Sequence, residues 1–409
     1  MEHTKKEIPV FTPYFDDKEE QLFLKALRSG WVAQGPMVAQ FEKMAAEYTG
    51  VGFGVATTSC TTALHLSLVA LGANKHHDVI VPSYTFVATA NAVEQTGATA
   101  VLVDVKLDTY CLDVDYLERF IEANYTNHSG VWKNNATCNE LFCIIPVHIF
   151  GLCADMPSVN RLAKHYNMRV LEDGACALGS GINGNRTFGN VSCLSFHARK
   201  SITTGEGGMV LTDDKDIFQN LQKLRSHSAS ISEVKRHKNN SYLMPDYDDI
   251  GYNYRMTDIQ GAIGIAQMQK IDHIIQKKRE LANRYDAGLQ AVPWLIPQHV
   301  PMGYYHTYQS YVVMLDYKRL GLTDIETGNS YRNRLMAYLD ENGVSTRQGT
   351  HAVHLLGYYK NKYGYGSEDL PGALQCDKLS IALPLYVGLA YEDQDYVVDM
   401  LVKANRFVI

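Results

Sequence analysis

The sequence has few of the features that mark metal-binding or disulfide-rich proteins. No CxxC pair and no metal-ligand spacing occurs among its cysteines, which are Cys60, Cys111, Cys138, Cys143, Cys153, Cys176, Cys193 and Cys376. Scattered cysteines are typical of reduced thiols in a cytoplasm and argue against a disulfide framework. Histidines at spacings that do not suggest a metal site include His148, His197, His351 and His354. We therefore expect no metal.

Strong positive charge and long apolar runs are absent as well. The formal net charge of the 409 residues is −6 and no basic face stands out, so nothing predicts binding to nucleic acid. No apolar run is long enough to span a bilayer, and the first residues contain no apolar stretch of signal-peptide length. We therefore expect a cytoplasmic protein that does not bind membranes. The hydrophobic content of 46% is ample for a core.

A lysine in unusual surroundings is the most informative feature that is present. Lys200 ends the run Ser195–Lys200 (SFHARK), and the glycine-rich turn Thr203–Gly208 (TTGEGG) follows closely. We expect Lys200 to lie on a short apolar strand, where poor hydration lowers the pKa of an ammonium group. Because neutral amines attack aldehydes, Lys200 is a candidate for the covalent binding of pyridoxal 5'-phosphate. A solvated lysine at a strand end is the alternative.

An acidic residue upstream suits the same cofactor. The run from Met168 to Leu171 leads into Glu172, Asp173 and Gly174, as a buried parallel strand does where it emerges into a site. Pyridoxal phosphate withdraws electrons only while its ring nitrogen is protonated, and a buried carboxylate keeps that proton in place. Asp173 is the candidate for this carboxylate. A cap on a helix that opens at Gly174 is the alternative.

Two further segments suit the phosphate and the ring of the cofactor. Small polar residues at Ser59, Cys60 and Thr61 run into apolar residues at helical spacing, and the N–H groups at a helix start bind anions. An ordinary capped helix without a ligand is equally compatible with this run. Phe86 follows a predicted buried strand over residues 78–81, and its flat ring suits stacking on the pyridine ring. A core aromatic residue is the alternative.

In this order, the segments resemble the DegT/DnrJ/StrS family of nucleotide-sugar aminotransferases, including perosamine synthase-like enzymes. This family belongs to the fold type I pyridoxal phosphate enzymes. The resemblance covers nearly the whole chain, and its markers are Ser29–Pro36, Pro146–Gly151, Glu172–Asp173, Ser195–Gly208, Gly251–Gln260 and Leu383–Tyr386. It implies an α/β fold with a mostly parallel mixed sheet flanked by helices, followed by a smaller C-terminal α+β domain.

The resemblance assigns roles residue by residue. Lys200 matches the lysine that forms the internal aldimine (a Schiff base), and Asp173 matches the acid at the pyridine nitrogen. Ser195 and Thr61 match phosphate-binding residues, with Ser59 and Cys60 beside them, and Phe86 matches the aromatic residue on the cofactor face. Asn253 matches an asparagine that reaches the phosphate from the neighbouring subunit, which implies a homodimer with shared active sites.

Three positions bear on how closely the chain follows the family. Cys60 stands where glycine is usual, so the local turn is expected to differ slightly. Cys176 stands near the cofactor ring where glutamine or histidine is frequent, and a thiol is a weak hydrogen-bonding partner. Lys200 is kept, whereas some relatives carry histidine there and remove a sugar hydroxyl group. This makes dehydration at the 3-position of the sugar less favoured.

The domain organisation follows from length and periodicity. We expect a large cofactor-binding domain over 1–265, including an N-terminal arm, and a linking helix with a small domain over 266–409. A helical pattern from Thr257 to Asp286 is interpreted as the link.

The polar segment 123–140 is interpreted as a surface excursion without an assigned role. A second polar stretch, Arg225–Asp249, is cationic, and in relatives the corresponding loop lies near the nucleotide-sugar; a solvated loop is equally compatible.

The resemblance implies an amino transfer in two halves. L-glutamate gives its amino group to the cofactor, which becomes pyridoxamine phosphate, and 2-oxoglutarate leaves; a nucleotide-linked keto-sugar then receives the amine. The segments Ser29–Trp31 and Tyr252–Arg255 favour a 4-keto-6-deoxy sugar for surface polysaccharides such as O-antigen. A dehydratase or lyase of nucleotide sugars, amination at the 3-position, and a non-catalytic ligand sensor are the alternatives. The nucleotide, GDP, dTDP or UDP, is left open.

Overall fold

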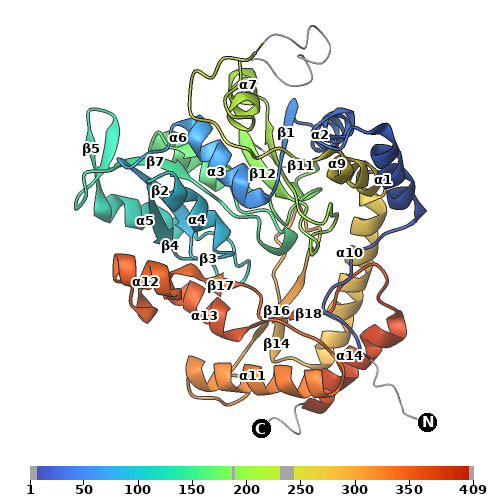
Figure 1. The fold of residues 1–409 in the computed structure, drawn as a ribbon. Coiled ribbons are helices and arrows are strands. Elements are labelled where there is room, and N and C mark those ends of the chain that lie inside the picture. Colours follow the sequence, from blue (N-terminus) through green and yellow to red (C-terminus); the bar gives the residue numbers. More distant parts are fainter. Residues whose placement is uncertain (1–6, 187–188, 231–243, 405–409) are drawn as a thin grey trace.

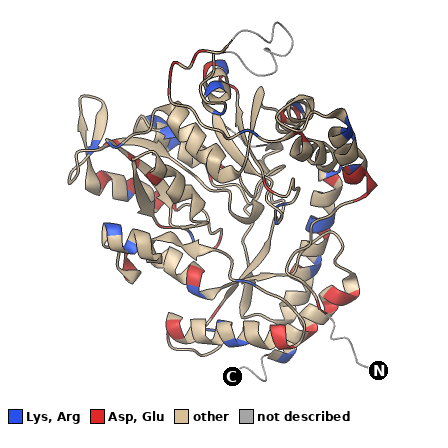
Figure 2. Cartoon of the chain, in the orientation of Figure 1, with Lys and Arg blue, Asp and Glu red and all other residues tan. Residues whose placement is uncertain are grey.

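The computed structural model describes residues 7–186, 189–230 and 244–404. Figure 1 shows a larger body that contains most of the sheet structure and a smaller body formed by the C-terminal part, with one long helix running alongside both. Basic and acidic residues are interspersed along the outer helices, as the colours of the ribbon in Figure 2 show. None of the helices in the described ranges has both the length and the apolar character needed to cross a membrane.

A six-stranded mixed sheet forms one half of the larger body. Its strand order is β4-β2-β7-β6-β5, with β8 paired to β7. The pairs β2–β4, β2–β7 and β7–β8 are parallel, whereas β5–β6 and β6–β7 are antiparallel. The strands are β2 (His77–Pro82), β4 (Thr99–Val103), β5 (Tyr125–His128), β6 (Val131–Asn134), β7 (Glu140–Ile144) and β8 (Arg169–Val170).

A second sheet, of order β1-β13-β12-β9, continues from the first. Its strands are β1 (Phe53–Thr57), β9 (Glu172–Asp173), β12 (Val191–Ser195) and β13 (Gly208–Thr212). β12 pairs with β9 in parallel and with β13 antiparallel. Only Leu171 separates β8 from β9, so the chain passes directly from one sheet to the other. The prediction of a mixed α/β sheet is confirmed.

Helices flank these sheets. Their bounds are α1 (Asp17–Ser29), α2 (Pro36–Thr49), α3 (Cys60–Leu71), α4 (Ala88–Gln95), α5 (Val114–Asn124), α6 (Met156–His165) and α7 (Lys215–Leu224). α3 is apolar on nearly all sides and is buried from Ala63 to Leu68, as expected for a helix enclosed by other elements. Its first turn is the exception, and that turn opens toward the site described below.

The predicted linking helix is wrong in one respect, because it is two helices. α9 (Asp258–Met268) packs on α1 and α2, and α10 (Ile271–Gly288) continues toward the smaller body. Lys270 leaves helical geometry between them, with φ −124° and ψ 11°. Its buried ammonium group binds Glu19 at 2.8 Å, so an ion pair from a distant part of the chain fixes the break. The division of the chain near residue 265 stays a proposal.

The smaller body packs helices on the antiparallel sheet β14-β16-β18. Its elements are β14 (Leu295–Pro297), β16 (Tyr311–Leu315), β18 (Ser380–Leu383), α11 (Ile325–Glu341), α12 (Gly357–Tyr363), α13 (Pro371–Leu379) and α14 (Tyr391–Ala404). Short strands elsewhere are β3 (Tyr84–Thr85), β10 (Gly181–Ile182), β11 (Asn185–Arg186), β15 (Tyr304–Tyr305) and β17 (His351–Ala352). Pairing of β3 with β17 connects the two bodies beside the site.

The segment predicted to be a surface excursion is mostly exposed, and it forms an ordered hairpin. β5 and β6 pair from Tyr125–Asn134 to His128–Val131 and extend the first sheet through β7. The buried carboxylate of Asp78 anchors it, accepting hydrogen bonds from Tyr125 at 2.8 Å, Asn134 at 2.8 Å and Asn139 at 2.9 Å. The polar side chains that suggested a loop therefore hold a strand in place.

Candidate active site

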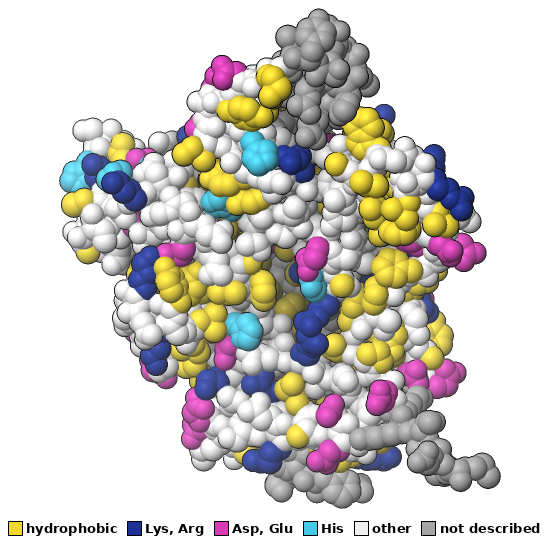
Figure 3. All heavy atoms as spheres, viewed as in Figure 1, with side chains coloured by type: hydrophobic (Ala, Val, Ile, Leu, Met, Phe, Trp, Pro, Cys, Tyr) yellow, Lys and Arg dark blue, Asp and Glu magenta, His cyan; other side chains and the backbone are white. Residues whose placement is uncertain are grey.

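A pocket of about 580 Å³ lies where the two bodies meet. Its walls come from the start of α3, the ends of β9 and β12, the segment around Phe86, and C-terminal residues near Arg347. Figure 3 shows a hollow near the centre of this face, with cationic, histidine and acidic side chains around it. The predicted site residues that line this pocket are Ser59, Cys60, Thr61, Phe86, Asp173, Cys176, Ser195 and Lys200.

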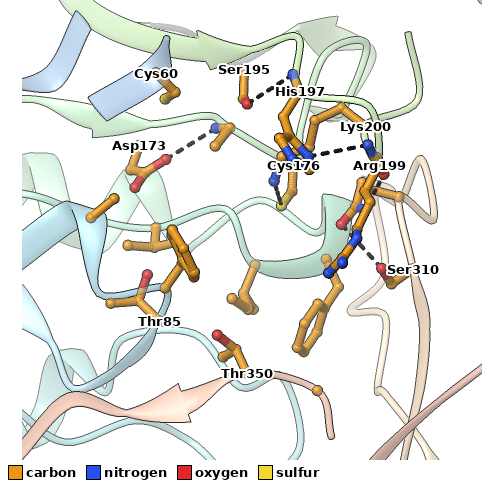
Figure 4. A pocket seen from close by; sticks show the side chains of 18 of the residues that line it. Cys60, Thr85, Asp173, Cys176, Ser195, His197, Arg199, Lys200, Ser310 and Thr350 are labelled. Carbon is orange, nitrogen blue, oxygen red and sulfur yellow. Dashed lines mark hydrogen bonds between the residues drawn. The ribbon is translucent and has the colours of Figure 1, made fainter. Parts of the chain in front are cut away.

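Lys200 projects into the pocket from a turn, so its expected place on a strand is wrong. β12 ends at Ser195, and the next residue, Phe196, bonds through its backbone to Gly207 and Thr204 across the turn. The Lys200 N–H then donates to the carbonyl oxygen of His197 at 2.9 Å. The Lys200 Nζ donates to Cys176 Sγ at 3.1 Å, and Figure 4 shows the two side chains together.

The predicted lowering of the Lys200 pKa is also wrong. Burial lowers the pKa of the Lys200 ammonium group, but the acidic groups around it, led by Cys176, outweigh burial and raise the pKa above its ordinary value. Burial raises the pKa of the Cys60 thiol well above its ordinary value, so Cys60 faces the pocket as a neutral thiol.

Asp173 is buried at the end of β9 and is fixed by two donors. Thr89 Oγ1 donates to Asp173 Oδ2 at 2.7 Å, and the backbone N–H of Ala175 donates to Oδ1 at 3.1 Å. No helix begins at Gly174, which removes the alternative of a helix cap. The carboxylate keeps lone pairs available toward the pocket, where a protonated ring nitrogen would be its natural partner.

A buried hydrogen bond behind Asp173 holds β9 in position. His148 Nε2 lies 2.8 Å from Glu172 Oε2, and both side chains are almost fully buried. The Ala154 N–H donates to His148 Nδ1 at 3.1 Å, which leaves the proton on Nε2 to donate to Glu172. His148 therefore has a role in the core, beside the strand that ends at Asp173.

The start of α3 lines the pocket with N–H groups and hydroxyls of the kind that bind anions. Ser59 caps the helix by accepting from the Thr62 N–H at 3.2 Å, and the Thr62 hydroxyl accepts from the Ser59 N–H at 3.0 Å. Thr61 and Ser195 take no part in this cap, and both line the pocket. A Cβ atom on Gly208 would lie 2.3 Å from the Ser59 carbonyl, so only glycine lets β13 approach the helix start this closely.

Phe86 and Asn253 differ in their relation to the pocket. Phe86 lines it and is 63% exposed, which leaves its ring open to a ligand. Asn253 is exposed and lies outside the pocket of its own chain, on a segment whose Tyr254 carbonyl accepts from the Thr58 N–H at 3.0 Å. A side chain placed in this way is available to a neighbouring subunit.

Arg225 does not belong to a cationic loop. Its guanidinium group is buried, where it pairs with Glu42 at 2.5 Å and donates to the Ala56 carbonyl at 2.7 Å. Arg225 is therefore neither part of a solvated loop nor a free cation near a nucleotide-sugar. The other cationic residues of that stretch include Lys235, Arg236, His237 and Lys238, which lie outside the described residues.

Comparison with known proteins decides the family. The model of the DegT/DnrJ/EryC1/StrS aminotransferase family matches residues 13–402. The chain belongs to this family. It is 33% identical to the GDP-perosamine synthase of Caulobacter vibrioides over 398 residues, covering 96% of this chain and 97% of that protein. It is 32% identical over 394 residues to the spore coat polysaccharide biosynthesis protein SpsC of Bacillus subtilis, covering 96% and 95% of the two chains.

Solved structures agree with this assignment. PseC of Helicobacter pylori, an aminotransferase involved in the biosynthesis of pseudoaminic acid, superposes with a TM-score of 0.85 at 25% identity, covering 98% of this chain and all of that one. The PMP-form of the sugar aminotransferase Spr1654 of Streptococcus pneumoniae gives 0.86 at 25% identity, with the same coverage. The fold is that of the type I pyridoxal phosphate enzymes.

Several residues of the aminotransferase pocket escaped prediction. Arg199 is the neighbour of Lys200 in the SFHARK run, which is the only sequence signal for it. Arg347 and Gln309 come from the C-terminal part and belong to no recognisable motif, yet both line the pocket. Within the described ranges, no group of histidine, cysteine and acidic residues could hold a metal ion.

A second buried lysine lies behind the pocket wall of the aminotransferase. Lys278 on α10 is 1% exposed, and its Nζ donates to the Gln309 carbonyl at 2.9 Å. Burial lowers the pKa of Lys278 to about 7, and the charge of Lys200 contributes to the lowering. The Gln309 side chain donates in turn to the Arg199 carbonyl at 2.8 Å, so Lys278 supports the turn that carries Lys200.

Proposed function

We propose that the protein is a pyridoxal phosphate-dependent aminotransferase that moves the amino group of L-glutamate onto the keto group of a nucleotide-linked sugar. One observation carries this proposal. The ammonium group of Lys200 and the buried carboxylate of Asp173 line a single pocket together with the N–H groups and hydroxyls at the start of α3. The relatives named GDP-perosamine synthase support a nucleotide-sugar substrate, and the PMP-form of Spr1654 supports the cofactor.

The chemistry of the lining groups fits pyridoxal 5'-phosphate. Lys200 would hold its aldehyde carbon covalently, and Asp173 would keep its ring nitrogen protonated. Thr61 and Ser195 would bind its phosphate with the N–H groups of the α3 start, and Phe86 would cover one face of its ring. When bound, the cofactor supplies an electron sink that stabilises negative charge on a neighbouring carbon atom.

The residues of the chain then have separate tasks. We propose that Lys200 Nζ, once free, takes the proton from the α-carbon of glutamate and in the second half returns a proton to the sugar carbon that gains the amine. Cys176 lies within hydrogen-bonding distance of this nitrogen and orients it. Asp173 would not move a proton itself; its negative charge would keep a proton on the ring nitrogen of the bound cofactor.

The proposal extends to the oligomeric state of the enzyme, its place in the cell and its acceptor sugar. Asn253 is exposed and lies outside the pocket of its own chain, which supports a homodimer in which each subunit completes the site of the other. We further propose that the enzyme works in the cytoplasm, without a membrane or nucleic-acid partner. We also propose a 4-keto-6-deoxy sugar as the acceptor. The relative named as a spore coat polysaccharide biosynthesis protein supports a product that is used for a polysaccharide.

The test is a panel of GDP-, dTDP- and UDP-linked keto-sugars incubated with enzyme and L-glutamate. We expect one of them to gain an amino group, seen by mass, with an equal amount of 2-oxoglutarate. The Lys200→Ala variant is the matched control and should form neither product. A dehydrated sugar without 2-oxoglutarate would instead identify a lyase, and no reaction with any acceptor would contradict the proposal.

A further inference from the structure

Two arginines at the mouth of the pocket have no acidic partner among the residues that the structure describes. Arg199 comes from the turn after β12, Arg347 from the segment that precedes β17, and both side chains are exposed while lining the pocket. In the part of the chain that the structure describes, neither guanidinium group forms an ion pair or a side-chain hydrogen bond. The pocket thus presents two free planar groups, each suited to bidentate contact with an oxyanion.

The surrounding charges leave this cationic pair uncompensated. The acidic residues that line the pocket are Asp173, whose carboxylate accepts from Thr89 and Ala175, and Glu206, which lies 3.7 Å from His197. Burial and the charge of Arg347 lower the pKa of Arg199, which indicates that the two cations are close enough to repel each other. An anion between them would relieve this repulsion.

Both arginines are anchored through the backbone, which leaves their side chains available. The Arg199 carbonyl accepts from Gln309 Nε2 at 2.8 Å. The Arg347 N–H donates to the Ala382 carbonyl at 3.2 Å, and the Ala382 N–H donates back at 2.6 Å. One arginine belongs to the larger body and the other to the smaller one, so an anion held by both would also tie the two bodies together.

We propose that Arg199 and Arg347 together bind an oxyanionic group of a substrate in front of Lys200. The inference rests on the proposed function, because it concerns the substrates of that same pocket. Two groups have the required chemistry: the carboxylate of the amino donor and the diphosphate of the nucleotide-sugar. In a reaction with two halves, each group enters the pocket in turn.

The two half-reactions separate these sources. The Arg199→Gln, Arg347→Gln and double variants are loaded with cofactor, and single-turnover rates are measured against glutamate and, separately, against the nucleotide-sugar. We expect a rise of about 10-fold or more in at least one half-saturating concentration, as for the loss of a charge-assisted hydrogen bond. Arg161→Gln, which removes an exposed arginine from α6, is the matched control and should change neither value.

Binding of unreactive probes gives an independent readout. Calorimetry with glutarate and with inorganic pyrophosphate is run on the same cofactor-loaded variants. If the variants bind glutarate more weakly and need more glutamate for half-saturation, the arginines bind the carboxylate of the amino donor. If they bind pyrophosphate more weakly and need more nucleotide-sugar for half-saturation, the arginines bind the diphosphate. If the binding of both probes is weakened, the two groups share the site. Arg347→Lys, which keeps the charge, should recover part of the affinity and thereby exclude misfolding.

The inference is overturned if the double variant binds both probes and saturates with both substrates within about twofold of wild type. That result would leave amination by the wild-type enzyme intact. The proposed function fails by a different result, the absence of amination in the wild type itself.

Discussion

Replacing Lys278 with methionine should make the protein more stable at low pH, although it removes a hydrogen bond. Within the described ranges Lys278 is buried without an acidic partner, and its ammonium group donates there to one backbone acceptor, the Gln309 carbonyl. Methionine has a similar length and carries no charge. The substitution therefore removes the cost of burying a charge and leaves the packing nearly unchanged.

The magnitude follows from the pKa. A fall from 10.5 in the unfolded chain to about 7 in the fold corresponds to about 5 kcal/mol of lost stability as an upper value. Below pH 7 both states are protonated and the cost is fully present. Between pH 7 and 10.5 the unfolded chain binds one proton more than the folded chain, so wild-type stability rises with pH. Leaving the Gln309 carbonyl unpaired costs the variant about 1–3 kcal/mol.

The assay is urea unfolding of cofactor-free protein at pH 6 and pH 10. At pH 6 the variant should be more stable than wild type by about 2–4 kcal/mol. This advantage should shrink by about 1.4 kcal/mol for each pH unit above 7 and disappear by pH 10. Lys277→Met, the preceding residue on α10, is the matched control because its ammonium group pairs with Glu280 near the surface. The reasoning is refuted if the difference between Lys278→Met and wild type is the same at both pH values.

Three further substitutions test the pocket itself. Asp173→Asn should lower kcat by about 10- to 100-fold, because a charge-assisted hydrogen bond is lost; steady-state rates at matched cofactor occupancy measure this. Cys176→Ala should lower the pKa of Lys200, since the thiol raises it, and mass spectrometry should show acylation of Lys200 in cofactor-free protein beginning at a lower pH than in wild type. Gly208→Ala should weaken cofactor binding by about 10-fold or more, because its Cβ would meet the Ser59 backbone; fluorescence titration measures this. An unchanged value in any of these assays would contradict the role given to that residue.

The local part of the site could be predicted from the sequence. Asp173 and Ser195 end neighbouring parallel strands, so a run of apolar residues followed by a polar one places them at the same sheet edge. Ser59 and its neighbours open a helix whose cap can be read from the residues themselves. Lys200 could be recognised as a site residue because a glycine-rich turn follows it closely in the sequence.

Features set by distant contacts could not be predicted in this way. The pKa of Lys200 rises because Cys176, 24 residues away, touches its ammonium group. Arg225 is buried because Glu42, 183 residues away, neutralises it. Asp78 holds the β5–β6 hairpin in the first sheet, and Glu19 binds Lys270 at the break between α9 and α10. In each case a partner from another element overrides what the local sequence favours.

The central claim is that the amine of Lys200 carries the cofactor. Its most direct test is reduction of the cofactor-loaded protein with borohydride, followed by digestion and mass spectrometry of the lysine-containing peptides. The account predicts one pyridoxyl adduct, on Lys200, and none in the Lys200→Ala variant. An adduct on Lys278, the buried lysine behind the pocket wall, or no adduct in the wild-type enzyme, would contradict it.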